Sequence, residues 1–162
     1  MKRCDLFTED TSGAVTSLHY APTTATSNFA NLLVAGFTGG GMRLFDDRSW
    51  GRNPVIKLED LQGSPILDAK LQDCANQSLL TAGNAKGKVR MYDIRMPYQS
   101  VSVGAGDISL THNMSAMTIH PRGGVFASWA QQQQIVSIYT LDHLNGTCNL
   151  LNHVKHHDEG VL

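Results

Sequence analysis

The amino-acid sequence predicts an all-β fold made of about three four-stranded antiparallel units, and three observations lead to this prediction. Segments of the 162-residue chain align at a constant offset of 47 residues, which carries Phe45 to Tyr92 and then to Tyr139. Short stretches alternate between apolar and polar side chains with the period of two that is typical of β-strands. Glycine-rich turns separate these stretches, and no helical periodicity competes with them.

The residues around the three aromatic positions repeat as well. Leu33–Gly36 aligns with Leu80–Gly83, and Arg43–Arg48 aligns with Arg90–Arg95. A period of about 40 to 50 residues is typical of four-stranded blades repeated around an axis. Each unit is therefore predicted to be one blade of a β-propeller.

The first blade is predicted over residues 14–58. Its second strand is apolar at successive positions, as expected where both faces of a sheet are covered. Thr38–Gly41 supplies the glycines that a tight hairpin needs at positive φ, and a polar insertion, Ala21–Asn31, precedes the second strand. The four predicted strands are Val15–Tyr20, Leu32–Phe37, Met42–Phe45 and Val55–Leu58.

The second and third blades are predicted over residues 65–103 and 114–151. In the third blade, Gln131–Gln134 occupies the hairpin position that holds glycine in the other two. The predicted strands of the second blade are Ile66–Leu71, Leu79–Gly83, Val89–Tyr92 and Ser100–Val103. Those of the third are Ala116–His120, Val125–Trp129, Ile135–Tyr139 and Cys148–Leu151.

Three blades do not close a ring, because closed propellers typically have about four to eight. Residues 2–7 read as the last strand of a preceding blade, and residues 152–162 as the lead into a following one. The sequence therefore predicts a partial propeller that is not closed on its own.

Composition and charge exclude several classes of function. The formal net charge is -1 and no basic run is present, which disfavours nucleic-acid binding. The longest apolar stretch, Leu32–Phe37, is far shorter than the ~20 residues of a membrane span, so no direct membrane insertion is expected. Cys4, Cys74 and Cys148 are widely spaced, a pattern that favours free thiols in a reducing compartment.

Motifs that carry catalysis, cofactors or metals are weak in this chain. Gly83–Val89 resembles a phosphate loop, but its spacing is wrong and a strand follows it, so a hairpin turn is predicted. His153, His156, His157 and Asp158 form the main cluster of potential metal ligands, and we expect a solvated loop there. We therefore expect no catalytic residue, no cofactor and no metal, and a protein that is not an enzyme.

Two Asp-x-Arg pairs are the most distinctive polar feature. Asp46 and Arg48 align with Asp93 and Arg95. In a structural interpretation, the aspartate tightens the turn after the third strand and the arginine holds that loop. In a functional one, an exposed arginine offers a planar five-donor group to a protein partner. The two interpretations are compatible, so Arg48 and Arg95 are candidate interaction residues.

A resemblance to known proteins begins at these positions. Phe45-Asp46 and Tyr92-Asp93 stand where WD-repeat proteins place a Trp-Asp dipeptide, and Tyr139-Thr140 is a degenerate third copy. In order and spacing, the chain resembles the C-terminal propeller of the raptor family, the regulatory scaffold subunits of target-of-rapamycin complex 1. The insertion and the glutamine-rich turn depart from that pattern.

The resemblance implies a non-catalytic scaffold that makes protein–protein contacts in nutrient and growth signalling. It also implies the target-of-rapamycin kinase and other complex subunits as partners, and a cytoplasmic location with recruitment to the lysosomal membrane through those partners.

Two other functions remain open at this point. The Asp-x-Arg pairs resemble the motif by which some WD-repeat proteins dock on the adaptor of a cullin-type ubiquitin ligase, which would make the chain a substrate receptor. Three glycosylation patterns begin at Asn76, Asn113 and Asn145, and they motivate a secreted ligand-binding or hydrolytic propeller.

Overall fold

The computed structural model describes residues 13–21, 31–48, 54–58, 63–74, 77–94, 108–142 and 144–155. Within these ranges the chain forms twelve β-strands and no helix. The strands make three four-stranded sheets, and in each sheet neighbouring strands pair in chain order. All the pairings are antiparallel. Each sheet is thus a meander, which confirms the predicted fold class.

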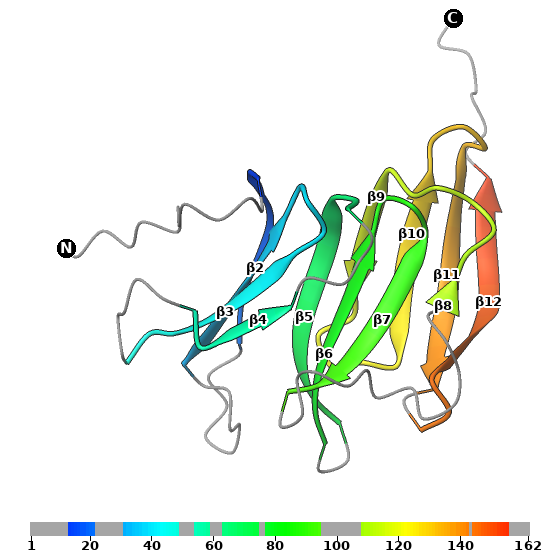
Figure 1. Ribbon diagram of the computed structural model, residues 1–162. Coiled ribbons are helices and arrows are strands. Elements are labelled where there is room, and N and C mark those ends of the chain that lie inside the picture. The colour runs from blue at the N-terminus through cyan, green and yellow to red at the C-terminus, as the bar shows by residue number, and fades with distance from the viewer. Residues whose placement is uncertain are drawn as a thin grey trace, which may run out of the picture.

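The strands have the following bounds. The first sheet contains β1 (Val15–Tyr20), β2 (Leu32–Phe37), β3 (Met42–Asp46) and β4 (Ile56–Leu58). The second contains β5 (Ile66–Cys74), β6 (Gln77–Asn84), β7 (Lys88–Asp93) and β8 (Ile108–Ser109). The third contains β9 (Ala116–Ile119), β10 (Val125–Ala130), β11 (Ile135–Asp142) and β12 (Thr147–Lys155). Figure 1 shows the three sheets side by side in chain order.

Two strand positions differ from the sequence prediction. The described fourth strand of the second sheet is β8, in which Ile108 pairs with Val89, whereas the predicted strand at 100–103 lies outside the described residues. Burial explains the position of β8, because Ile108 packs into the core between the second and third sheets. In the third sheet, β12 continues to Lys155, so residues 152–155 extend that sheet and do not begin a connection. Residues 2–7 and 156–162 lie outside the described ranges.

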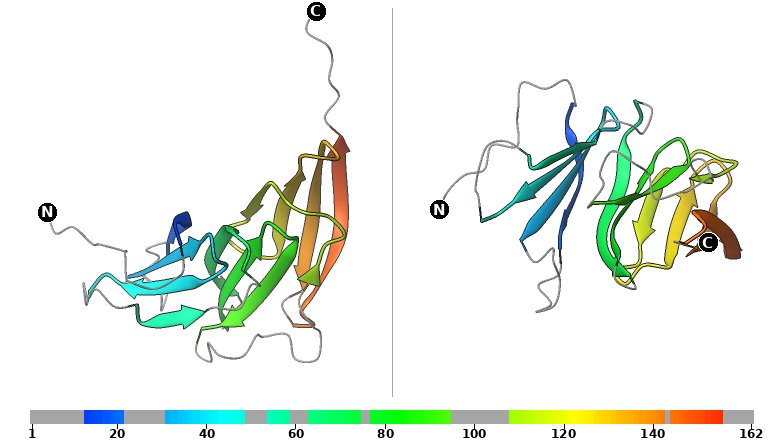
Figure 2. Two further views of the ribbon diagram at one scale, coloured as in Figure 1. Left: turned by 45° about the horizontal axis from the view of Figure 1, so that its top comes forward. Right: turned by 60° about the horizontal axis from the view of Figure 1, so that its bottom comes forward.

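The sheets pack face to face through their first strands. β5 contacts β1 and β2, and β9 contacts β5, so the first strand of each sheet lies closest to its neighbours. Figure 2 shows that the three sheets diverge from the side on which their first strands lie, and that β12 is at the outer edge of the third sheet. This is the arrangement of propeller blades.

Side chains alternate between the two faces of each sheet and so build separate cores. Val34 and Leu44 face the second sheet and pack with Leu71, Leu80 and Tyr92. A second core lies between the second and third sheets, and its buried residues are Val89, Met91, Ile108, Met114, Ile119, Phe126, Tyr139 and Leu141. These two apolar layers hold the three sheets together.

The repeat explains where the aligned aromatic residues lie. Tyr92 packs toward the first sheet, and Tyr139 packs toward the second. Phe45 clusters with Ala35 and Phe37 on the other face of the first sheet. Tyr92 and Tyr139 therefore lie on the face of their sheet that is turned toward the preceding sheet. Phe45 lies on the corresponding face of the first sheet.

The three hairpins between second and third strands share one backbone requirement. Gly40, Gly87 and Gln134 stand 47 residues apart, and their φ angles are 86°, 79° and 51°. Glycine adopts positive φ without steric cost, whereas a residue with a Cβ atom is strained there. The glutamine-rich turn keeps the hairpin geometry and accepts that strain at Gln134.

Replacing Gln134 with glycine is expected to stabilise the fold. Relief of the left-handed conformation outweighs the added freedom of the unfolded chain, so the free energy of unfolding should rise by a few tenths to about 1 kcal/mol. Urea denaturation measures the change. Gln133→Gly is the matched control, since Gln133 is an exposed turn residue outside the positive-φ set. An equal gain for both variants would contradict the strain at Gln134.

Candidate protein-interaction surface

The first Asp-x-Arg pair closes the turn that follows β3. The Arg48 side chain donates from Nε to Asp46 Oδ1 at 3.0 Å and from Nη2 to Oδ2 at 2.6 Å. The Arg48 backbone N–H donates to Asp46 Oδ1 at 2.9 Å. This two-pronged geometry is the one that guanidinium and carboxylate groups favour. It holds the Arg48 side chain in a defined direction at the end of the strand.

Arg48 is the exposed member of the pair. The Arg48 side chain is 70% exposed and that of Asp46 is 17% exposed. The hydrogen bond from the Arg48 side chain lowers the pKa of Asp46, and the same bond raises the pKa of Arg48. A charged, oriented guanidinium at the surface is suited to binding a carboxylate or a main-chain carbonyl on a protein partner.

The second pair is described only in part. Asp93 ends β7 at the position equivalent to Asp46, and Arg95 lies outside the described residues. The interaction role of Arg48 and Arg95 stays a prediction.

The three repeat aromatics are buried and offer no surface to a partner. Phe45, Tyr92 and Tyr139 are 6%, 3% and 9% exposed. Tyr139 stacks on Phe126 with ring centroids 4.9 Å apart and planes inclined by 12°. Their role is to pack the sheets, which leaves the loops and hairpin tips as the candidate interaction surface.

The segment Gly83–Val89, which resembles a phosphate loop, forms the predicted hairpin turn. β6 ends at Asn84 and β7 begins at Lys88, and the Gly87 N–H donates to the Asn84 carbonyl at 3.1 Å. Asn84 Oδ1 accepts hydrogen bonds from the N–H groups of Lys86 and Lys88 at 3.1 and 3.0 Å. These backbone donors are used within the turn, so they do not form an anion cradle.

The other candidate site residues are exposed where the structure describes them. His153 lies on β12, while His156, His157 and Asp158 lie outside the described ranges. The described residues contain no group of three or more His, Cys, Asp or Glu side chains placed to hold a metal. Of the glycosylation asparagines, Asn113 and Asn145 are exposed, and Asn76 is not described. Among the described elements no helix is long and apolar enough to span a membrane.

Two of the curated proteins similar to this chain are subunits of target of rapamycin complex 1. KOG1, a subunit of target of rapamycin complex 1 in Saccharomyces cerevisiae, is 29% identical over 159 residues, which cover 87% of this chain. Mip1, a subunit of the same complex in Schizosaccharomyces pombe, is 28% identical over 105 residues, or 65% of this chain. The chain spans only 10% and 8% of the lengths of these relatives. No protein-family model matches the chain.

A solved structure agrees with these relatives. The crystal structure of Chaetomium thermophilum Raptor superposes on 93% of this chain with a TM-score of 0.67 and 25% identity. The chain is similar to raptor proteins in both sequence and fold. It covers 12% of that Raptor chain. The β-propeller domain of Myceliophteria thermophila Cps50 (Swd1), with a TM-score of 0.60 and 15% identity, supports the fold alone.

The raptor-like region contains a buried polar junction that sequence reasoning missed. Asp68 Oδ2 accepts a hydrogen bond from the Ile119 N–H of the third sheet at 2.9 Å. Gln72 Nε2 donates to the His120 carbonyl at 2.9 Å, and Gln72 Oε1 accepts from Thr81 Oγ1 at 3.1 Å. These bonds tie β5 to the end of β9. The sequence gives little signal for the burial of Asp68 and Gln72, because polar and apolar residues alternate along β5 as they do on a strand with one face in solvent.

His19 of the raptor-like region lies partly buried between the first two sheets. Burial lowers its pKa, the charge of Lys70 lowers it further, and Asp68 and a backbone hydrogen bond at Leu71 oppose the shift. Both charged neighbours of His19 belong to β5. They form an ion pair with each other, with Lys70 Nζ 3.3 Å from Asp68 Oδ1. The folded state thus favours the neutral imidazole.

Stability is therefore expected to fall as the pH drops below the ordinary histidine pKa of 6.5. Below that value the unfolded chain takes up a proton that folded His19 resists, and the loss continues down to the lowered folded pKa. His19→Gln should flatten this part of the profile when melting temperature is measured from neutral to mildly acidic pH. His153→Gln, on exposed β12, is the control. Identical profiles for wild type and His19→Gln would contradict the assignment.

Proposed function

We propose that this chain is a non-catalytic scaffold region of target of rapamycin complex 1, which makes protein–protein contacts in nutrient and growth signalling. The observation that carries the proposal is the similarity of most of the chain to subunits of that complex in two yeasts and to Chaetomium thermophilum Raptor. Similarity across both sequence and structure supports a shared role more strongly than the fold does, since propellers serve many functions.

The architecture is suited to a scaffold. The buried apolar residues lie in the layers between the sheets. Polar hairpins and connections lie at the ends of the strands. Rigid sheets hold such loops in fixed positions, and binding residues are disproportionately found on loops of this kind. The partners we propose are the target-of-rapamycin kinase and the other subunits of the complex.

Affinity purification of the tagged protein from its own cells tests this proposal. Recovery of a target-of-rapamycin kinase is expected. Recovery of a cullin-ligase adaptor without that kinase would overturn the scaffold role and support the substrate-receptor alternative.

The Asp46–Arg48 turn gives the proposal a residue-level test. Arg48→Glu reverses the charge of an exposed group and is expected to weaken recovery of a partner several-fold while the melting temperature changes little. Arg48→Lys keeps the charge but loses the two-pronged geometry, so it separates orientation from charge. Unchanged recovery with Arg48→Glu and with Arg95→Glu would reject the interaction role of these residues.

The location of the protein is part of the proposal. We expect a cytoplasmic protein that reaches the lysosomal membrane through its partners. Fluorescence microscopy of the tagged protein should show lysosomal enrichment when nutrients are sufficient and its loss on starvation. Retention within the secretory pathway would contradict it.

A further inference from the structure

A polar pocket lies between the second and third sheets, and the Asp46–Arg48 turn of the first sheet does not line it. Its volume is about 290 Å³. Three segments line it: the β6–β7 hairpin, the connection from β8 to β9, and the glutamine-rich β10–β11 hairpin. The lining residues are Lys86, Leu110, Thr111, His112, Asn113, Ala130, Gln132 and Gln133.

The walls of the pocket are fixed by backbone hydrogen bonds. The Leu110 N–H donates to the Gly87 carbonyl and the Met114 N–H donates to the Ala85 carbonyl, each at 2.8 Å. The Ser115 N–H donates to the Trp129 carbonyl at 2.8 Å. The connection is thereby bound to both neighbouring sheets, and a ligand would not have to order it.

Glycine at position 87 is required for this arrangement. A Cβ atom there would collide with the main-chain oxygen of His112, and the φ of Gly87 is +79°. The close approach of the β6–β7 hairpin to the connection therefore depends on the absence of a side chain.

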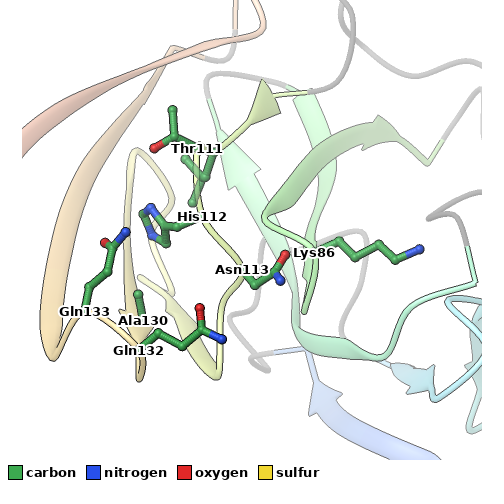
Figure 3. A pocket seen from close by; sticks show the side chains of 8 residues that line it. Lys86, Thr111, His112, Asn113, Ala130, Gln132 and Gln133 are labelled. Atoms are coloured by element: carbon green, nitrogen blue, oxygen red, sulfur yellow. The ribbon is translucent and has the colours of Figure 1, made fainter.

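The lining offers many hydrogen-bonding groups and no carboxylate. Asn113, Gln132 and Gln133 each present a carboxamide with a donor and an acceptor, which matches the groups of a peptide main chain. His112 Nε2 is buried and has no hydrogen-bond partner among the described residues, although buried nitrogen atoms normally have one. Figure 3 shows the His112 and glutamine side chains grouped on one side, while the Lys86 side chain extends away from them.

The charge of the lining favours one sign of ligand. Lys86 carries a positive charge at the edge of the pocket, and no Asp or Glu is among the lining residues. An acidic segment meets attraction there and a basic one meets repulsion.

We propose that this pocket binds a short, extended, acidic peptide segment of a partner protein. The carboxamides of Asn113, Gln132 and Gln133 hold its main chain, His112 Nε2 gains its missing partner, and Lys86 attracts its carboxylates. The site is separate from the Asp46–Arg48 turn, and it does not depend on assembly of the kinase complex.

A phage-displayed library of random short peptides, selected on the purified protein, tests the proposal. We expect acidic sequences to be enriched. The combined Gln132→Ala and Gln133→Ala variant should weaken binding of an enriched peptide about tenfold or more. Lys86→Glu should weaken it several-fold, as should changing the acidic residues of the peptide to their amides.

Gln131→Ala is the matched control, because Gln131 lies in the same exposed turn but does not line the pocket. Thr111→Trp, a change at an exposed lining position, is expected to block the pocket and abolish binding. All the variants should retain the wild-type melting temperature. The peptide assay uses the purified protein without the kinase complex, which separates this site from the proposed scaffold role.

Several outcomes would overturn the proposal. They are enrichment of no peptide, enrichment of basic peptides, equal binding by wild type and the double glutamine variant, and an equal loss with Gln131→Ala.

Discussion

Tyr92→Ala is expected to lower the free energy of unfolding by about 3–5 kcal/mol, the cost of removing a buried aromatic side chain. Tyr92 is 3% exposed and packs in the core that joins the first and second sheets. The variant would leave a cavity between the two sheets, whose backbones are held by their own hydrogen bonds and cannot close around it. Chemical denaturation measures the loss, and reduced soluble expression should accompany it.

Two variants control the Tyr92 experiment. Tyr92→Phe keeps the ring and should lose much less stability. Phe45→Ala removes the equivalent ring on the other face of the first sheet, where Phe45 is also buried, and should cost a similar amount. A wild-type melting temperature for Tyr92→Ala would contradict the core position of the repeat aromatics.

Asp68→Ala is expected to cost about 2–4 kcal/mol, because two buried N–H groups would lose their acceptor. The carboxylate accepts from the Ala69 N–H at 3.0 Å and from the Ile119 N–H at 2.9 Å. β5 is the first strand of its sheet and pairs on one side only, so some of its backbone groups have no partner in the ladder. The side chain satisfies one of these groups and reaches across to the third sheet.

The hydrogen-exchange rate of the Ile119 amide measures the hydrogen bond between this N–H group and Asp68. Protection is expected in the wild type and should be lost in Asp68→Ala. Asp68→Asn retains one acceptor oxygen and should keep part of both the protection and the stability. Rapid exchange of the Ile119 amide in the wild type would contradict the bridging role of Asp68.

The strands that pack on a neighbour were predictable from local pattern. The bounds of β1 and β2 agree with the predicted ones, because burial of one or both faces imposes a pattern on consecutive residues. The outer strand predicted for the second sheet, residues 100–103, lies outside the described residues, and the outer strand that the structure describes is β8. β8 has only two residues and pairs with one neighbour, so it has no periodic pattern of its own. Its position is set by the packing of Ile108 in the core between the second and third sheets.

The Asp46–Arg48 pair could be anticipated because its partners are two residues apart. The polar pocket could not, because its lining comes from positions as distant as Lys86 and Gln133. These two positions are 47 residues apart and so are equivalent in the repeat. The repeat does not predict that the connection from β8 to β9 lies between the two hairpins; its hydrogen bonds to both sheets place it there.

The repeat of 47 residues by itself determined that the chain forms blades, which residue of each blade is the buried aromatic, and where a hairpin needs positive φ. Those features follow from periodicity and backbone sterics, which act over a few residues at a time. Only the tertiary structure decided which face each aromatic covers, that Asp68 and Gln72 join the second sheet to the third, and that a pocket opens between two hairpins. These features depend on contacts between different sheets, and burial and hydrogen bonding at that range leave no regular spacing in the sequence.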